Sequence, residues 1–143
     1  MNRNMEAKNK GLVGIVVVSH SNTLAEEVIS FVKVFKQEDF ALENGGNAKR
    51  EVYGTNVENV KQAIIRADKG AGVLVFVDME SSVFNAVKAI KELEGQVEAK
   101  IADAPFLEGV ISAVAGNFDG IDLDDLKIIA EDSRKFTKLR KEI

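Results

Sequence analysis

The chain of 143 residues has no cysteine, one proline and a single histidine, His20. The absence of cysteine excludes disulfides, thiolate nucleophiles and cysteine metal ligands, and it fits a reducing cytoplasm. With one histidine in addition, the chain lacks the nitrogen and sulfur ligands from which a zinc site is usually built. We therefore expect neither a metal site nor a cofactor of its own in this chain.

The chain also lacks a large excess of charge of either sign. The 19 basic and 23 acidic residues give a net charge of -4 and are interspersed, which argues against nucleic acid or an anionic membrane as the main partner. No apolar run approaches the roughly 20 residues of a membrane span. We expect a disordered extension over residues 1–10, a single domain over 11–137 and a charged tail over 138–143.

What the sequence does contain is an alternation of strand and helix patterns. Apolar β-branched runs predict strands over 12–18 and 71–78, and weaker ones over 39–42 and 97–102. Helical spacing of apolar residues predicts helices over 22–36, 57–67, 82–93 and 106–114, and one starting near Asp124. Pro105 suits the beginning of the fourth helix. This pattern predicts an α/β fold with a doubly wound, mainly parallel sheet and helices on both faces.

The most familiar strand order for such a short chain, 2-1-3-4, makes a prediction about two distant residues. His20 follows the first strand and Asp78 follows the third, so both would lie at the carboxyl edge, where such folds bind ligands. A carboxylate on one ring nitrogen fixes the tautomer and leaves the other nitrogen as a nucleophile. The alternatives are an exposed loop histidine and an aspartate that caps a helix.

The residues around His20 suit an anion. Thr23 and Glu26 have the spacing of a capping box, which predicts a helix N-terminus just after the histidine. Such an N-terminus favours a phosphoryl group. The candidate phosphate-binding residues near the histidine are Ser21, Asn22 and Thr23, through their backbone N–H groups. Further candidates are Ser81 and Ser82, and the alternative interpretation of these two serines is that they cap the helix that follows Asp78.

Other readings of these elements fail on particular residues. The glycines of "GLVG" precede the first strand, whereas a dinucleotide fingerprint needs them after it. No Walker lysine-serine pair follows a glycine loop, and a response-regulator receiver needs an acidic pair where this chain has Ser-His-Ser. Ser19 and Ser21 flank His20, but neighbours in sequence rarely form a nucleophile and base pair.

Four segments follow one another across residues 11–118: "IVVVSHSNTLAEEV", the glycine loop with "YGTNVENVKQAI", "VLVFVDMESSVFNAVKAIKEL" and "APFLEGVISAV". In this order they resemble the mannose-type IIA family of the bacterial phosphotransferase system. The resemblance implies a homodimeric phosphocarrier that receives a phosphoryl group on His20 from the phosphocarrier HPr, with Asp78 orienting the histidine.

Within the family, the segments most resemble the branch that serves PEP-dependent dihydroxyacetone kinase. That resemblance implies transfer to ADP on a kinase subunit of the DhaL type, so the nucleotide would belong to a partner. The alternatives are a IIA component of a sugar transporter, which passes phosphate to a IIB domain, and a binding module without catalysis. Relatives in the kinase branch commonly have glycine where this chain has Glu80.

Overall fold

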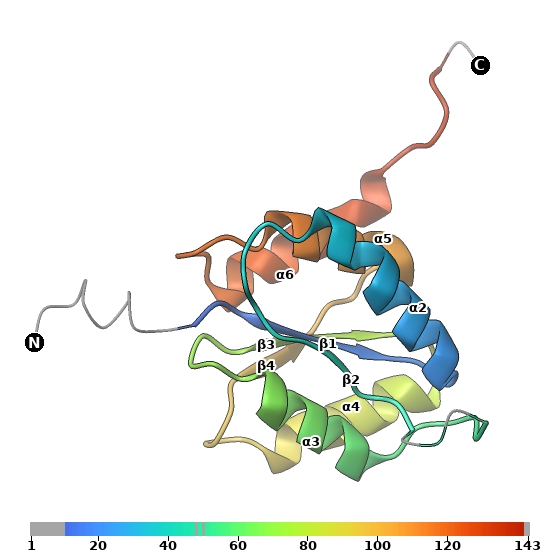
Figure 1. The fold of residues 1–143 in the computed structure, drawn as a ribbon, viewed down its shortest axis with the longest axis vertical. Coiled ribbons are helices and arrows are strands. Elements are labelled where there is room, and N and C mark those ends of the chain that lie inside the picture. The colour runs from blue at the N-terminus through green and yellow to red at the C-terminus, as the bar shows by residue number, and fades with distance from the viewer. Residues whose placement is uncertain (1–10, 48, 50, 142–143) are drawn as a thin grey trace, which may run out of the picture.

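The computed structural model describes residues 11–47, 49 and 51–141. Its centre is a parallel four-stranded sheet in the order β2-β1-β3-β4 (Figure 1). The strands are β1 (Gly14–Val18), β2 (Leu42–Asn44), β3 (Val73–Val77) and β4 (Ala99–Ile101). The predicted fold class and strand order are confirmed. The extension expected over 1–10 and the last two residues of the expected tail lie outside the described residues.

Helices cover both faces of the sheet (Figure 1). One face carries α2 (Asn22–Val32), α5 (Phe106–Gly116) and α6 (Leu123–Asp132), and the other carries α3 (Val57–Ala67) and α4 (Ser81–Glu92). Short 3-10 turns, η1 (Lys33–Phe35) and η2 (Ser133–Lys135), follow α2 and α6. Pro105 is the residue before α5, as its fixed φ allows. No helix among the described residues is long and apolar enough to cross a membrane.

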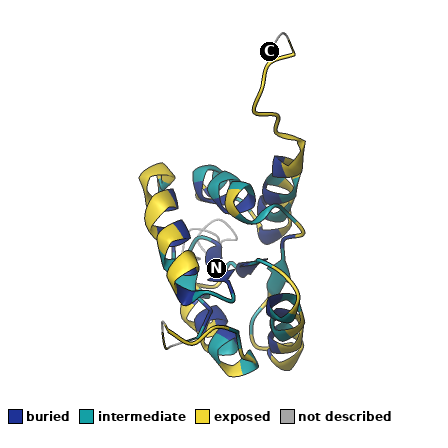
Figure 2. Cartoon of the chain, turned by 90° about the vertical axis from the view of Figure 1, so that its right-hand side faces the viewer, coloured by how far each residue is buried: buried dark blue, intermediate teal, exposed yellow. Residues whose placement is uncertain are grey.

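The strands divide the core into two parts because successive side chains of a strand point to opposite faces. Ile15 and Val17 pack under α2, α5 and α6, whereas Val16 and Val18 pack against α3 and α4. All five residues of β1 are buried, which explains why its sequence is continuously apolar. Figure 2 shows the buried residues on the inner sides of the helices and the exposed ones on their outer sides.

The second strand lies later in the chain than the sequence pattern suggested. An extended stretch is predicted over 39–42, but β2 begins at Leu42, opposite Ile15, and ends at Asn44, opposite Val17. The apolar signal misled because Phe40, which is only 5% exposed, contributes to the core from the loop before the strand. Asn44 in turn extends the strand because it pairs with β1, although asparagine is rare in strands.

Candidate functional site

The site lies at the carboxyl edge of the two central strands. β1 and β3 are paired up to Val18 and Val77, and the Asp78 N–H donates to the Val18 carbonyl at 3.2 Å. The side chains that follow these strands therefore meet, although they are far apart in sequence. The His20 side chain is 26% exposed and that of Asp78 is 15% exposed, so the imidazole is held by the protein and still reachable from solvent.

The Asp78 carboxylate contacts the His20 ring, with Oδ1 3.0 Å from Nδ1. Burial raises the pKa of Asp78, but the hydrogen bonds to its ionised form outweigh burial and hold the pKa below its usual value. These bonds come from the Ser82 hydroxyl, the N–H groups of His20 and Met79, and the Ser19 hydroxyl. An ionised carboxylate only accepts hydrogen bonds. Nδ1 of His20 therefore carries the proton in this pair.

The other ring nitrogen, Nε2, then has a free electron pair. The Ser81 Oγ lies 2.8 Å from Nε2, so its hydroxyl donates to that electron pair. The Ser82 Oγ lies 3.2 Å from Nδ1, and its side chain is fully buried. The structure thus brings both predicted serines of α4 into contact with His20, where they fix the ring from the side of β3.

The N-terminus of α2 begins directly after the histidine, as predicted, but with a different cap. Ser21 is the N-cap and its hydroxyl accepts from the Leu24 N–H at 3.1 Å. The capping box predicted for Thr23 and Glu26 is wrong, because the helix starts before Thr23 and its side chain is exposed. The first amides after the Ser21 N-cap are those of Asn22 and Thr23, which as first-turn residues have no acceptor within the helix.

The Asn22 side chain serves a loop instead of the imidazole. Its Nδ2 donates to the Asn47 carbonyl, which ties α2 to the segment after β2. The same loop reaches the site further on, where the Gly54 N–H donates to the His20 carbonyl at 2.8 Å. Asn85 of α4 holds the loop end, with Nδ2 3.1 Å from the Thr55 carbonyl and 2.6 Å from its Oγ1. The sequence suggested a glycine loop here but gave no sign that it would touch the histidine.

Glu80 stands between Asp78 and Ser81 in a strained conformation. Its φ is +46°, in the left-handed region that favours glycine, and it is the only residue other than glycine with positive φ in the described part of the chain. Its carbonyl accepts from the N–H groups of Val83 and Phe84, which starts α4. Glycine adopts this φ without strain, so Glu80 occupies a position that a glycine would fit more easily.

The described residues contain no group of three or more histidine, aspartate or glutamate side chains placed to hold a metal ion. The site itself consists of a histidine with one free ring nitrogen, a carboxylate on the other, two hydroxyls and the N-terminus of a helix. This set can accept and stabilise an electrophilic anion at Nε2.

Comparison with known proteins places this geometry in context. Residues 14–125 match the family EIIA-man, described as "PTS system fructose IIA component". Among curated proteins, the chain is 30% identical over 118 residues to the "PEP-dependent dihydroxyacetone kinase, phosphoryl donor subunit DhaM" of Escherichia coli (strain K12). That alignment covers 79% of this chain but only 25% of the relative, so the chain spans about a quarter of the relative's length.

Solved structures share the fold at low sequence identity. The protein EF1359, of unknown function, has a TM-score of 0.73 at 22% identity and covers 91% of this chain and all of its own. The phosphotransferase system component EIIA from Streptococcus agalactiae has a TM-score of 0.63 at 18% identity, with 89% of this chain and 97% of its own covered. At these identities the likeness concerns the fold.

Proposed function

Because the chain belongs to the EIIA-man family of phosphotransferase system components, we propose that it is a phosphohistidine carrier that is charged on His20 by phospho-HPr. In the same proposal, it passes the group to ADP bound on a DhaL-type subunit of PEP-dependent dihydroxyacetone kinase. The observation that carries the proposal is the state of the imidazole: Asp78 holds Nδ1 at 3.0 Å and leaves Nε2 as the nucleophile.

The chemical step is an in-line displacement at phosphorus. The Nε2 electron pair forms the new nitrogen–phosphorus bond, while the bond from phosphorus to the donor's histidine breaks and its electron pair returns to that nitrogen. The proton on Nδ1 stays in place, and the ionised Asp78 stabilises the positive charge that the ring gains. Transfer to ADP repeats the same displacement with the phosphate oxygen of ADP as nucleophile.

The groups around Nε2 match the needs of the transferred group. The Ser81 hydroxyl donates to Nε2 in the free protein and must leave it when phosphorus arrives. It can then donate to a phosphoryl oxygen, with the first-turn amides of Asn22 and Thr23 as further donors. The proposal uses the backbone N–H groups of Asn22 and Thr23, the groups expected from the sequence, whereas the Ser21 N–H already donates to the Ser19 hydroxyl.

A protein donor also needs a surface next to the histidine. Three apolar side chains that adjoin the site residues in sequence are strongly exposed: Tyr53 by 80%, Met79 by 57% and Phe84 by 75%. Exposed apolar side chains grouped at a reactive residue are typical of a contact surface for another protein. They support transfer between proteins over reaction with a small free phosphate donor.

The choice of acceptor rests on the DhaM relative and on the motifs shared with the kinase branch, above all "APFLEGV" and the "GG" before "YGTN". The second candidate is a IIA component of a sugar transporter, since the family as a whole is described by a fructose IIA component. A homodimer and a cytoplasmic location are part of the proposal and rest on the family relationship.

The test is to charge the protein with enzyme I, HPr and labelled phosphoenolpyruvate, and then to offer ADP-loaded DhaL-type subunit or a IIB domain. We expect label that acid removes and alkali spares, as for a phosphohistidine, and discharge by the kinase subunit. Discharge by the IIB domain alone would favour the sugar transporter. Label on the His20→Ala variant, or none on the wild type, would contradict the proposal.

A further inference from the structure

Ser19 is a buried polar residue at the end of β1 whose hydroxyl joins two parts of the site. Its exposed fraction is 0%. The Oγ donates to Asp78 Oδ2 at 2.9 Å and accepts from the Ser21 N–H at 3.0 Å. Ser21 is the N-cap of α2. One hydroxyl therefore connects the carboxylate that orients the histidine to the helix whose N-terminus faces the proposed phosphoryl group.

The contacts of Asp78 show what this hydroxyl controls. Oδ1 contacts Nδ1 of His20 at 3.0 Å and accepts from the Met79 N–H at 2.7 Å. Oδ2 has two donors, the Ser19 hydroxyl and the His20 N–H, both at 2.9 Å. Because rotation about the last bond of an aspartate side chain is soft, the plane of the carboxylate depends on these partners. Without the Ser19 hydroxyl, Asp78 would keep the Ser82 hydroxyl and the N–H groups of His20 and Met79 as partners, and Oδ1 would be held less firmly against Nδ1.

We propose that Ser19 is a positioning residue of the phosphocarrier. Its buried hydroxyl holds the Asp78 carboxylate and the N-cap of α2 in a fixed position relative to each other, so that His20 keeps its proton on Nδ1. This inference rests on the proposed function of His20 as the nucleophile. A neutral imidazole with its proton on Nε2 has no electron pair there and cannot attack phosphorus. Ser19 thus acts on the reaction through the tautomer of His20.

The test compares two buried serines. Ser133 is 2% exposed, and its Oγ has no hydrogen-bond partner among the described residues, so Ser133→Ala is a matched control that removes no hydrogen bond to His20 or Asp78. For Ser19→Ala we expect uptake from phospho-HPr to slow about 10- to 100-fold, the loss typical when a residue that orients a histidine's partner is removed. Ser19→Thr, which keeps the hydroxyl, should restore the rate, and Ser133→Ala should leave it unchanged.

A second readout separates positioning from a general loss of structure. Nitrogen-15 NMR of the uncharged protein reports the tautomer of His20 directly, since there is no other histidine. We expect the Nε2-protonated form to increase in Ser19→Ala and not in Ser133→Ala. An unchanged tautomer in Ser19→Ala would overturn the inference. So would a Ser19→Thr variant that has the wild-type tautomer but has lost uptake. A wild type that is never charged would refute the proposed function, while the tautomer would still decide on Ser19.

Discussion

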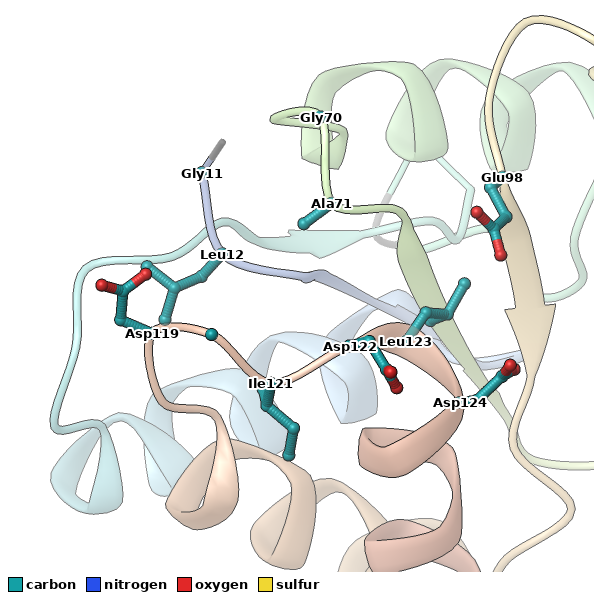
Figure 3. Close-up of a pocket in the computed structure, with 11 residues that line it drawn as sticks. Gly11, Leu12, Gly70, Ala71, Glu98, Asp119, Ile121, Asp122, Leu123 and Asp124 are labelled. Atoms are coloured by element: carbon teal, nitrogen blue, oxygen red, sulfur yellow. The ribbon is translucent and has the colours of Figure 1, made fainter. Parts of the chain in front are cut away.

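The two edges of the sheet offer different kinds of candidate site. At the carboxyl edge, hydrogen bonds converge on His20 and Asp78, and the imidazole is only partly exposed. At the amino edge, an open cavity of about 430 Å³ lies between the segments that precede β1, β3 and β4 and the loop that leads into α6 (Figure 3). The amino edge thus has an open cavity, whereas the carboxyl edge has a compact cluster of side chains that contact a histidine ring.

The acidic side chains of the amino-edge cavity illustrate the difference. Figure 3 shows Asp119, Asp122 and Asp124 from the loop and the start of α6, and Glu98 from the segment before β4. Asp122 caps α6 by accepting from the Asp125 N–H at 2.8 Å, and Asp124 pairs with Lys100. Two of the four carboxylates thus have structural partners. A hollow with acidic walls is therefore weaker evidence for a reaction than a carboxylate aimed at a nucleophile.

The largest expected effect comes from the Asp78 carboxylate at the carboxyl edge. Asp78→Asn keeps the shape but removes the charge and replaces one acceptor oxygen with an NH2 donor. The side chain then no longer requires the proton on Nδ1, so uptake from phospho-HPr should fall about 10⁴-fold. The matched change at the other edge is Asp122→Asn, which retains a good cap and should leave uptake unchanged. Pre-steady-state labelling measures both rates. Equal rates for Asp78→Asn and wild type would reduce Asp78 to a structural residue.

A smaller effect is expected on the surface around the site. Phe84→Ala removes a side chain that is 75% exposed and should raise the KM for phospho-HPr about tenfold, with little change in kcat, if this ring contacts the donor. Ile128→Ala on α6, which covers the opposite face of the sheet from α4, is the control; Ile128 is 56% exposed, and the change should alter neither constant. Equal KM values for both variants would show that the donor binds elsewhere.

The strained residue between the site groups should change stability more than activity. Glu80→Gly places glycine at φ +46° and should raise the free energy of unfolding by about 1 kcal/mol. Glu80→Gln removes the charge but keeps the strain, so its stability should match the wild type. Denaturant titration compares the three proteins. A destabilised Glu80→Gly would mean that the carboxylate makes a contact that outweighs the strain.

The smallest effect is expected at the amino edge. Asp124→Asn breaks the contact with Lys100, which lies on the exposed surface. Exposed ion pairs of this kind contribute little. We expect phosphoryl uptake and the midpoint of thermal unfolding to stay within error of the wild type. Loss of uptake in this variant would mean that the amino edge takes part in the reaction after all, and would break the distinction between the two edges.

The sequence allowed the larger features of the site to be predicted because they depend on topology. Continuous apolar strands between helices predict the parallel sheet, and the strand order then brings His20 next to Asp78. Local details of the site could not be predicted from the sequence because they depend on tertiary contacts. Whether Ser21 or Thr23 caps α2 is decided by where β1 ends, and the role of the Ser19 hydroxyl depends on an aspartate 59 residues later. At Glu80 the one signal was the departure from the glycine expected from the resemblance; the strain itself belongs to the turn into α4.

The central claim is that His20 carries the phosphoryl group on Nε2 while Asp78 holds Nδ1. Its most direct test is phosphorus and nitrogen NMR of the protein labelled with nitrogen-15 in its one histidine, before and after charging by phospho-HPr. The account predicts an Nδ1-protonated ring that, once charged, shows phosphorus coupled to Nε2 with the Nδ1 proton retained. Phosphorus coupled to Nδ1, or a charged protein with an unmodified imidazole, would contradict it.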